Sequence, residues 1–69
     1  MLIEGRNSVL ELLESERDIN KILIAKGERH GSINKIITLA KQRKIVIAEV
    51  EKTKLNAISE TNNHQGVIA

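Results

Sequence analysis

Short apolar runs divide the chain and predict buried β-strands. They occupy residues 22–25, residues 45–48 with Val50 close behind, and residues 67–69. The runs are rich in β-branched residues and nearly continuous rather than alternating, which is typical of strands covered on both faces of a sheet. We expect Leu2 and Ile3 to add a short strand at the edge.

Between these runs, apolar residues recur at helical spacing. The clearest set follows the i, i+3, i+4, i+7 pattern of one helix face and consists of Ile33, Ile36, Ile37 and Ala40. An earlier set comprises Val9, Leu10, Leu12 and Leu13, and a shorter, later one comprises Leu55 and Ile58. Ser32 and Thr53 are candidate N-caps of the second and third helices, because a hydroxyl oxygen there can accept a backbone N–H bond.

The order of these elements predicts an α/β domain. Strands alternate with helices, so we expect crossover connections that place helices over the sheet. We predict one domain over residues 1–69, built as a three-layer sandwich with a small mixed or parallel sheet flanked by helices. The run at 67–69 stops in mid-strand, which favours a fragment of a longer protein, and a natural edge strand is the alternative.

Composition narrows the classes of partner and compartment. The chain has no Phe, Tyr or Trp, so its core is aliphatic and modules that stack RNA bases on aromatic side chains are excluded. It has no Cys, which excludes disulfides and favours a cytoplasmic protein. The net charge of +2 permits an RNA partner without demanding one. No apolar run has the length of a membrane span, so we expect no membrane partner.

The sequence holds no recognisable catalytic constellation. Neither His has a second metal ligand three or four positions away, and no glycine-rich phosphate loop is present. We therefore expect no catalytic residue, no metal and no cofactor in this chain, and a complete small enzyme is the least favoured hypothesis.

A Gly5-Arg6-Asn7 sequence stands directly before the first predicted helix. Helix N-termini present N–H groups and a partial positive charge, which suit a phosphate. Arg6 adds a planar donor fork, and the Asn7 carboxamide offers both a donor and an acceptor. These properties indicate an RNA contact; in the alternative, Asn7 or Ser8 is an N-cap and Arg6 is solvated.

A second polar segment, Asn63-His64-Gln65-Gly66, precedes the last predicted strand. Its side chains can hydrogen-bond, and Gly66 would allow a close backbone approach. The segment is either a further RNA contact or a polar turn that leads into the strand.

The loop between the first strand and the second helix carries positive charge. Arg29 and His30 lie between glycines at 27 and 31, and Lys26 directly precedes Gly27. It is either a basic loop that touches RNA or a flexible crossover.

Together these segments resemble the N-terminal substrate-binding domain of the SpoU (TrmH-like) family of RNA ribose 2′-O-methyltransferases, closest to its RlmB branch. The resemblance covers nearly the whole chain, in residues 3–7, 9–13, 22–25, 36–40 and 63–69. Its specific part is the order of Gly-Arg-Asn at the start and Asn-His-Gln-Gly near the end, about one small domain apart.

The resemblance implies a function and a parent protein. The domain would recruit RNA for a separate knotted domain that binds S-adenosylmethionine, forms the homodimer and carries the catalytic residues. The parent would then be a methyltransferase of large-subunit ribosomal RNA. The RNA-binding residues would be Gly5, Arg6, Asn7, Lys26, Arg29, His30, His64 and Gln65.

The element order is also similar to that of small ribosomal proteins that bind kink-turn RNA. Their RNA contact is a Gly-x-Asn-Glu sequence opening a helix, which Gly5 and Asn7 match, while Ser8 replaces the Glu. This resemblance implies the location of the surface and not kink-turn specificity. The alternative function is a protein-interaction module that docks on the catalytic domain, the dimer mate or a ribosomal protein.

Overall fold

The computed structural model describes residues 2–27, 31–61 and 63–69, and within these ranges the chain forms three helices and three strands. In chain order they are α1 (Arg6–Glu14), β1 (Lys21–Ala25), α2 (Ser32–Gln42), β2 (Val46–Val50), α3 (Lys52–Ile58) and β3 (Val67–Ile68). This order is the one that the apolar pattern predicts.

The sheet is mixed and has the strand order β2-β1-β3. β1 and β2 are parallel, in a register that runs from Lys21 opposite Val46 to Ala25 opposite Val50. A parallel pair needs a crossover connection, and α2 supplies it. β3 runs antiparallel to β1, with Leu23 opposite Ile68 and Ile24 opposite Val67.

The N-terminal segment extends the sheet beyond β3. Ile3 and Ala69 exchange backbone hydrogen bonds of 3.4 and 2.8 Å, and the Gly5 N–H donates to the Val67 carbonyl at 3.2 Å. Glu4 opposes Ile68 in an isolated antiparallel bridge. The expected edge segment is therefore present, although it forms a single bridge rather than a regular strand over Leu2 and Ile3.

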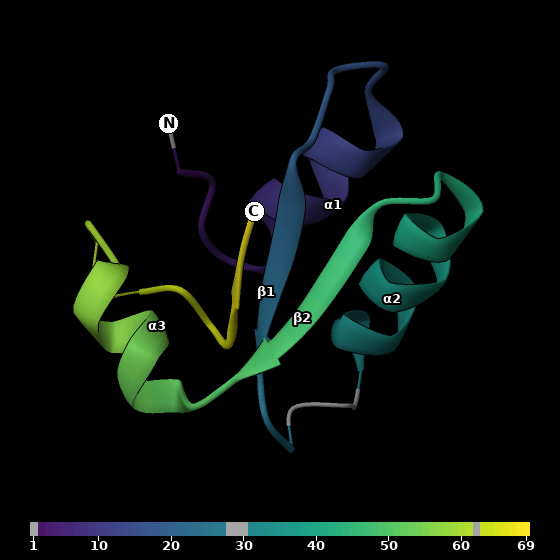
Figure 1. Cartoon of the computed structure of the whole chain (residues 1–69). Coiled ribbons are helices and arrows are strands. Elements are labelled where there is room, and N and C mark those ends of the chain that lie inside the picture. The colour runs from purple at the N-terminus through teal and green to yellow at the C-terminus, as the bar shows by residue number, and fades with distance from the viewer. Residues whose placement is uncertain (1, 28–30, 62) are drawn as a thin grey trace.

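The helices cover the two faces of the sheet unequally, and Figure 1 shows α3 across the sheet from α1 and α2. One core cluster lies beneath α1 and α2 and consists of Val9, Leu13, Ile22, Ile24, Ile33, Ile36, Ala40 and Val67. The other lies beneath α3 and contains Ala25, Leu55 and Ile68. Successive strand residues point to opposite faces, so each strand feeds both clusters. The predicted three-layer α/β sandwich is confirmed.

β2 departs from the expectation that every strand is covered on both faces. Val46 is 63% exposed, and Ile47, Ala48 and Val50 are only half-buried. β2 lies at the edge of the sheet, and α3 packs against the central strand β1 and leaves part of β2 uncovered.

The expected N-caps are wrong, because each candidate cap lies within its helix rather than before it. Gly5, Gly31 and Glu51 precede the three helices, and none of them makes a side-chain capping bond. Ser32 and Thr53 lie inside the first turns of α2 and α3, as Asn7 and Ser8 do in α1. The first backbone N–H of α1 instead donates to a side chain from a distant part of the chain.

Arg43, which follows α2, caps the C-terminal end of α1. One guanidinium nitrogen donates to the carbonyls of Leu13 and Ser15, both at 3.2 Å, and to that of Leu12 at 3.5 Å. The second terminal nitrogen donates to the Arg17 carbonyl at 2.7 Å. The last carbonyls of a helix have no partner within it, so this contact both satisfies them and fixes α1 against α2.

Candidate nucleic-acid interface

The candidate site lies at the edge of the sheet where β1 and β2 end, which we call the carboxyl edge. α2 and α3 begin there (Figure 1). α1 begins beside the start of β3, which the bond from the Ala25 N–H to the Gly66 carbonyl (2.9 Å) fixes next to the end of β1. In α/β sheets this edge is the usual place for ligands, because strand ends and helix N-termini converge on it.

The two motifs singled out in the sequence meet here. The Arg6 N–H donates to Gln65 Oε1 at 2.9 Å, and Arg6 Nε donates to the Gln65 carbonyl at 3.2 Å, across a separation of 59 positions. The Gln65 carboxamide therefore caps α1 from outside the helix. We call this pairing the Arg6–Gln65 junction.

Gly5 makes the junction possible. Its φ of +92° lies in the left-handed region, and a Cβ added there would be 3.2 Å from Gln65 Oε1. A side chain at position 5 would thus be strained and would also press on the capping carboxamide. Gln65 itself has a φ of 54°, so the backbone has a positive φ on both sides of the junction.

His64 stabilises the turn behind the junction. The Gly66 N–H donates to His64 Nδ1 at 2.9 Å, so this nitrogen is unprotonated. The proton of the neutral ring is therefore on Nε2, which donates to Asn56 Oδ1 at 2.7 Å. The ring is only 6% exposed, and both of its nitrogens are engaged. His64 was expected among the RNA contacts, and this stays a prediction; its two ring bonds tie the turn at 64–66 to α3.

A cleft of about 300 Å³ opens over the junction. Its lining combines two cationic side chains with three carboxamides and consists of Arg6, Lys52, Asn56, Asn63, His64, Gln65 and Gly66. Guanidinium and ammonium groups bind phosphate, while carboxamides can both donate to and accept from base edges and ribose hydroxyls. This combination suits a nucleotide.

Glu4 stabilises the loop that leads from α3 towards the cleft. Its carboxylate accepts bonds from the Ser59 hydroxyl, the Glu60 N–H (2.8 Å), and the Thr61 N–H and hydroxyl (3.2 and 3.0 Å). These bonds, that of Ser59 first, lower the pKa of the Glu4 carboxyl below its ordinary value. No local pattern indicates this role, because the partners lie more than fifty positions away along the chain.

Asn7 and Lys26 are two further expected site residues. Asn7 is exposed on the first turn of α1, one position from the junction. Lys26 follows β1 at the carboxyl edge, and its Nζ lies 3.0 Å from Glu51 Oε1 in a pair that is mostly solvent-exposed. Such a pair contributes little and can yield to a phosphate. Arg29 and His30 lie outside the described residues.

Lys52, Asn56 and Asn63 were not among the expected contacts. Lys26 directly follows β1, and Lys52 lies two residues after the end of β2, at the start of α3. Because parallel strands end at one edge, the sequence pattern could have placed both lysines together. Asn56 could not have been found in this way, because its position depends on the bond to His64.

Among the described side chains, no group of three or more His, Cys, Asp or Glu residues could hold a metal ion. In the same part of the chain, no helix has the length and apolar character needed to cross a membrane.

Comparison with known proteins shows the family. A family model described as RNA 2′-O ribose methyltransferase substrate binding matches residues 2–69. A Staphylococcus saprophyticus protein named as a TrmH family tRNA/rRNA methyltransferase is 42% identical over 69 residues, which are 100% of this chain and 27% of that protein. Proteins with the same name from Staphylococcus aureus and Staphylococcus haemolyticus are each 41% identical, over 99% and 100% of this chain and 27% of their own length.

The chain therefore belongs to the substrate-binding domain family of the SpoU/TrmH RNA 2′-O-ribose methyltransferases. It spans about a quarter of the length of the curated relatives it matches.

Proposed function

We propose that this domain holds ribosomal RNA at its carboxyl edge and recruits it to the catalytic domain of an RNA ribose 2′-O-methyltransferase. The observation that carries the proposal is the cleft at the Arg6–Gln65 junction, where cations and carboxamides meet at a helix N-terminus. The family match supports RNA as the substrate, and the names of the relatives support a methyltransferase as the parent.

The proposed RNA contacts are of two kinds, with phosphate and with ribose or base edges. Arg6 and Lys52 bind phosphate, and Lys26 adds a cation where β1 ends. Asn7, Asn63 and Gln65 contact ribose or base edges through their carboxamides. The chain has no aromatic residues, so recognition depends on hydrogen bonds and phosphate contacts rather than base stacking.

The methyl donor belongs to a different domain. S-adenosylmethionine would bind in the larger part of the parent protein, through which the parent would also dimerise. The residues described here supply substrate positioning only. Titration of the 69-residue chain with S-adenosylmethionine is expected to show no binding, and measurable binding would contradict this division of labour.

RNA titrations with charge-matched variants test the proposed site. Arg6→Ala/Lys52→Ala removes two cations from the cleft, and Lys21→Ala/Lys41→Ala removes two exposed cations elsewhere. Binding to a structured ribosomal RNA fragment is measured at two salt concentrations. The cleft variant should bind more weakly and lose about 1.4 from its salt slope, at roughly 0.7 per phosphate contact on single strands.

The control should keep the affinity and most of the slope. If both variants bind RNA as the unmodified chain does, the assignment of the site is wrong. Tight association with the separate catalytic domain, in a chain without RNA affinity, would instead favour the protein-interaction module.

A further inference from the structure

Two carboxamides of the cleft have a fixed orientation, because each of them accepts a hydrogen bond from the protein itself. A free carboxamide can turn either its oxygen or its NH₂ group towards a ligand. Gln65 cannot, because its Oε1 accepts the backbone N–H of Arg6 at 2.9 Å. A backbone N–H only donates, so the Gln65 oxygen has to face α1 and the Nε2 amide is the end that remains for a ligand.

A chain of two bonds fixes the Asn56 carboxamide in the same way. The chain begins at the Gly66 N–H, which donates to His64 Nδ1 at 2.9 Å and keeps this nitrogen unprotonated. The neutral ring then has its proton on Nε2, which lies 2.7 Å from Asn56 Oδ1. The ring is the donor in this contact, so the Asn56 oxygen faces His64 and the Nδ2 amide is the end that remains for a ligand.

The cleft is therefore rich in hydrogen-bond donors. Asn56 and Gln65 are exposed and line it together with Arg6 and Lys52. The guanidinium and ammonium groups can only donate, and the two carboxamides present their NH₂ groups. Asn63 also lines the cleft, but no bond between described residues fixes its carboxamide, so this side chain can present either end.

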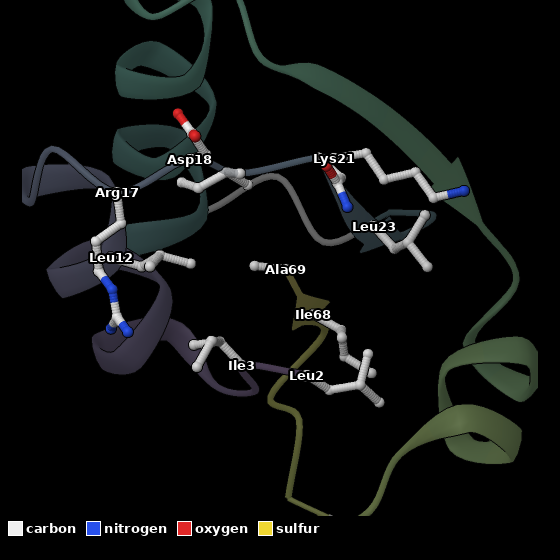
Figure 2. A pocket seen from close by; sticks show the side chains of 11 residues that line it. Leu2, Ile3, Leu12, Arg17, Asp18, Lys21, Leu23, Ile68 and Ala69 are labelled. Atoms are coloured by element: carbon white, nitrogen blue, oxygen red, sulfur yellow. The ribbon is translucent and has the colours of Figure 1, made fainter.

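This polarity is not a general property of the surface. A second hollow, of about 400 Å³, lies at the opposite end of the sheet, where β1 begins (Figure 2). Its lining combines apolar side chains with the cations of Arg17 and Lys21 and the carboxylate of Asp18. A carboxylate only accepts hydrogen bonds, so this hollow offers both kinds of partner.

We propose that the cleft selects RNA nucleotides whose base presents a carbonyl oxygen, uridine and guanosine, over cytidine and adenosine. The inference rests on the proposed function and adds Asn56 to the residues that contact a base. Uracil O4 and guanine O6 accept hydrogen bonds, whereas cytosine and adenine have a donating amino group at the equivalent position. That amino group would place a donor against the fixed amides of Asn56 and Gln65.

Phosphate oxygens are acceptors too, but all four nucleotides share them. Arg6 and Lys52 bind them under the proposed function, so these two cations contribute affinity without a choice of base. A preference among bases has to come from the two carboxamides. Cations alone would bind every RNA sequence alike.

Two RNA octamers, one of uridine and one of cytidine, test the preference. They have equal charge and ring size, and uracil has a carbonyl oxygen where cytosine has an amino group. The 69-residue chain should bind the uridine octamer roughly three- to tenfold more tightly, which corresponds to one net hydrogen bond. Asn56→Asp and Gln65→Glu keep an oxygen for the internal bond and replace the NH₂ group with a second oxygen. Each variant should abolish or reverse the preference.

Asn20→Asp is the matched control, because it adds the same negative charge at an exposed position in the lining of the hollow at the opposite end of the sheet. It should keep the ratio of the two affinities. Nitrogen NMR of the His64 ring provides a second measurement, in which the proton is expected on Nε2. A proton on Nδ1 would reverse the chain of bonds and overturn the orientation assigned to Asn56.

The outcomes separate this inference from the proposed function. Equal affinities for the two octamers in the unmodified chain, with both affinities lowered in Arg6→Ala/Lys52→Ala, would overturn the inference and leave the proposed function standing. A preference that survives in Asn56→Asp and in Gln65→Glu would overturn it too, because other groups would then select the base. If Arg6→Ala/Lys52→Ala binds both octamers as the unmodified chain does, the proposed function is wrong and the inference falls with it.

Discussion

At the scale of single residues, Gly5 links the stability of the domain to the shape of its candidate site. Its positive φ is shared by Gly27, but only at Gly5 would an added Cβ meet another side chain, Gln65 Oε1 at 3.2 Å; at Gly27 it would meet nothing within 4 Å. The two glycines therefore separate the cost of backbone strain from the cost of disturbing the junction.

Gly5→Ala is expected to cost about 1–2 kcal/mol of unfolding free energy, and Gly27→Ala about 1 kcal/mol. Both substitutions force Ala into the left-handed region, and Gly5→Ala also displaces the carboxamide that caps α1. Urea unfolding gives the free energies, and RNA titration gives the affinities. Only Gly5→Ala should weaken RNA binding, and equal losses of affinity in the two variants would contradict the role of the junction.

The lowered pKa of Glu4 predicts that the unfolding free energy of the domain decreases at acid pH. We call this decrease the acid limb. Its pKa is lowered in the folded protein, above all by the Ser59 hydroxyl bond, so folding favours the ionised form. The resulting stabilisation is fully present above the pKa of an unfolded glutamate, and it is lost as pH falls through the lower folded pKa.

Glu4→Gln should therefore destabilise the domain at neutral pH and flatten the acid limb. Urea unfolding at a series of pH values measures this. Glu14→Gln, at an exposed position in the last turn of α1, is the matched control and should retain the limb. If Glu4→Gln keeps the full acid dependence, other carboxyl groups are responsible for it.

At the scale of elements, the helices and strands follow from the sequence, whereas their ends do not. The apolar pattern predicts all three helices and the strand order along the chain, because one buried stripe per helix is a local signal. The caps come from distant residues: the Gln65 carboxamide caps the first turn of α1, and the Arg43 guanidinium caps its last turn. A cap formed across 59 or 30 positions leaves no mark in the neighbouring sequence, so local rules assigned Asn7, Ser8, Ser32 and Thr53 instead.

The contribution of the Arg43 cap to stability can be tested by substitution. Arg43→Met should cost about 2–3 kcal/mol, because it leaves several carbonyls at the end of α1 without a charged donor. Arg43→Lys should recover only part of the loss, since one ammonium cannot span carbonyls that the guanidinium fork reaches together. Chemical denaturation measures the loss, and Lys41→Met, at an exposed position in the last turn of α2, is the control. Full recovery by lysine would show that charge alone is sufficient.

At the scale of the whole molecule, the two ends of the sheet have different chemistry. The carboxyl edge has the polar cleft, whereas the hollow at the opposite end of the sheet is lined by both apolar and charged side chains. The sequence predicted part of this division, because Gly5-Arg6-Asn7 and Asn63-His64-Gln65-Gly66 are both candidate RNA contacts from the sequence alone. It could not predict that His64 would turn inward or that Lys52 and Asn56 would join the cleft, because these depend on how α3 packs against the turn at 64–66.

Net charge cannot locate the RNA surface, because exposed cations lie at both ends of the sheet. Lys21 and Lys41 lie away from the cleft, while Lys26 and Lys52 lie at the carboxyl edge. Under the proposed function, amide signals of Gly5, Arg6 and Gly66 should shift when a ribosomal RNA fragment is added, and those around Lys21 should not. The shifts should fade between about 50 and 200 mM salt, because phosphate contacts release counterions. Two-dimensional NMR titration at both salt concentrations measures this. Equal shifts at the two ends of the sheet would indicate non-specific attraction, and shifts confined to the residues around Lys21 would place RNA at the wrong end of the molecule for this proposal.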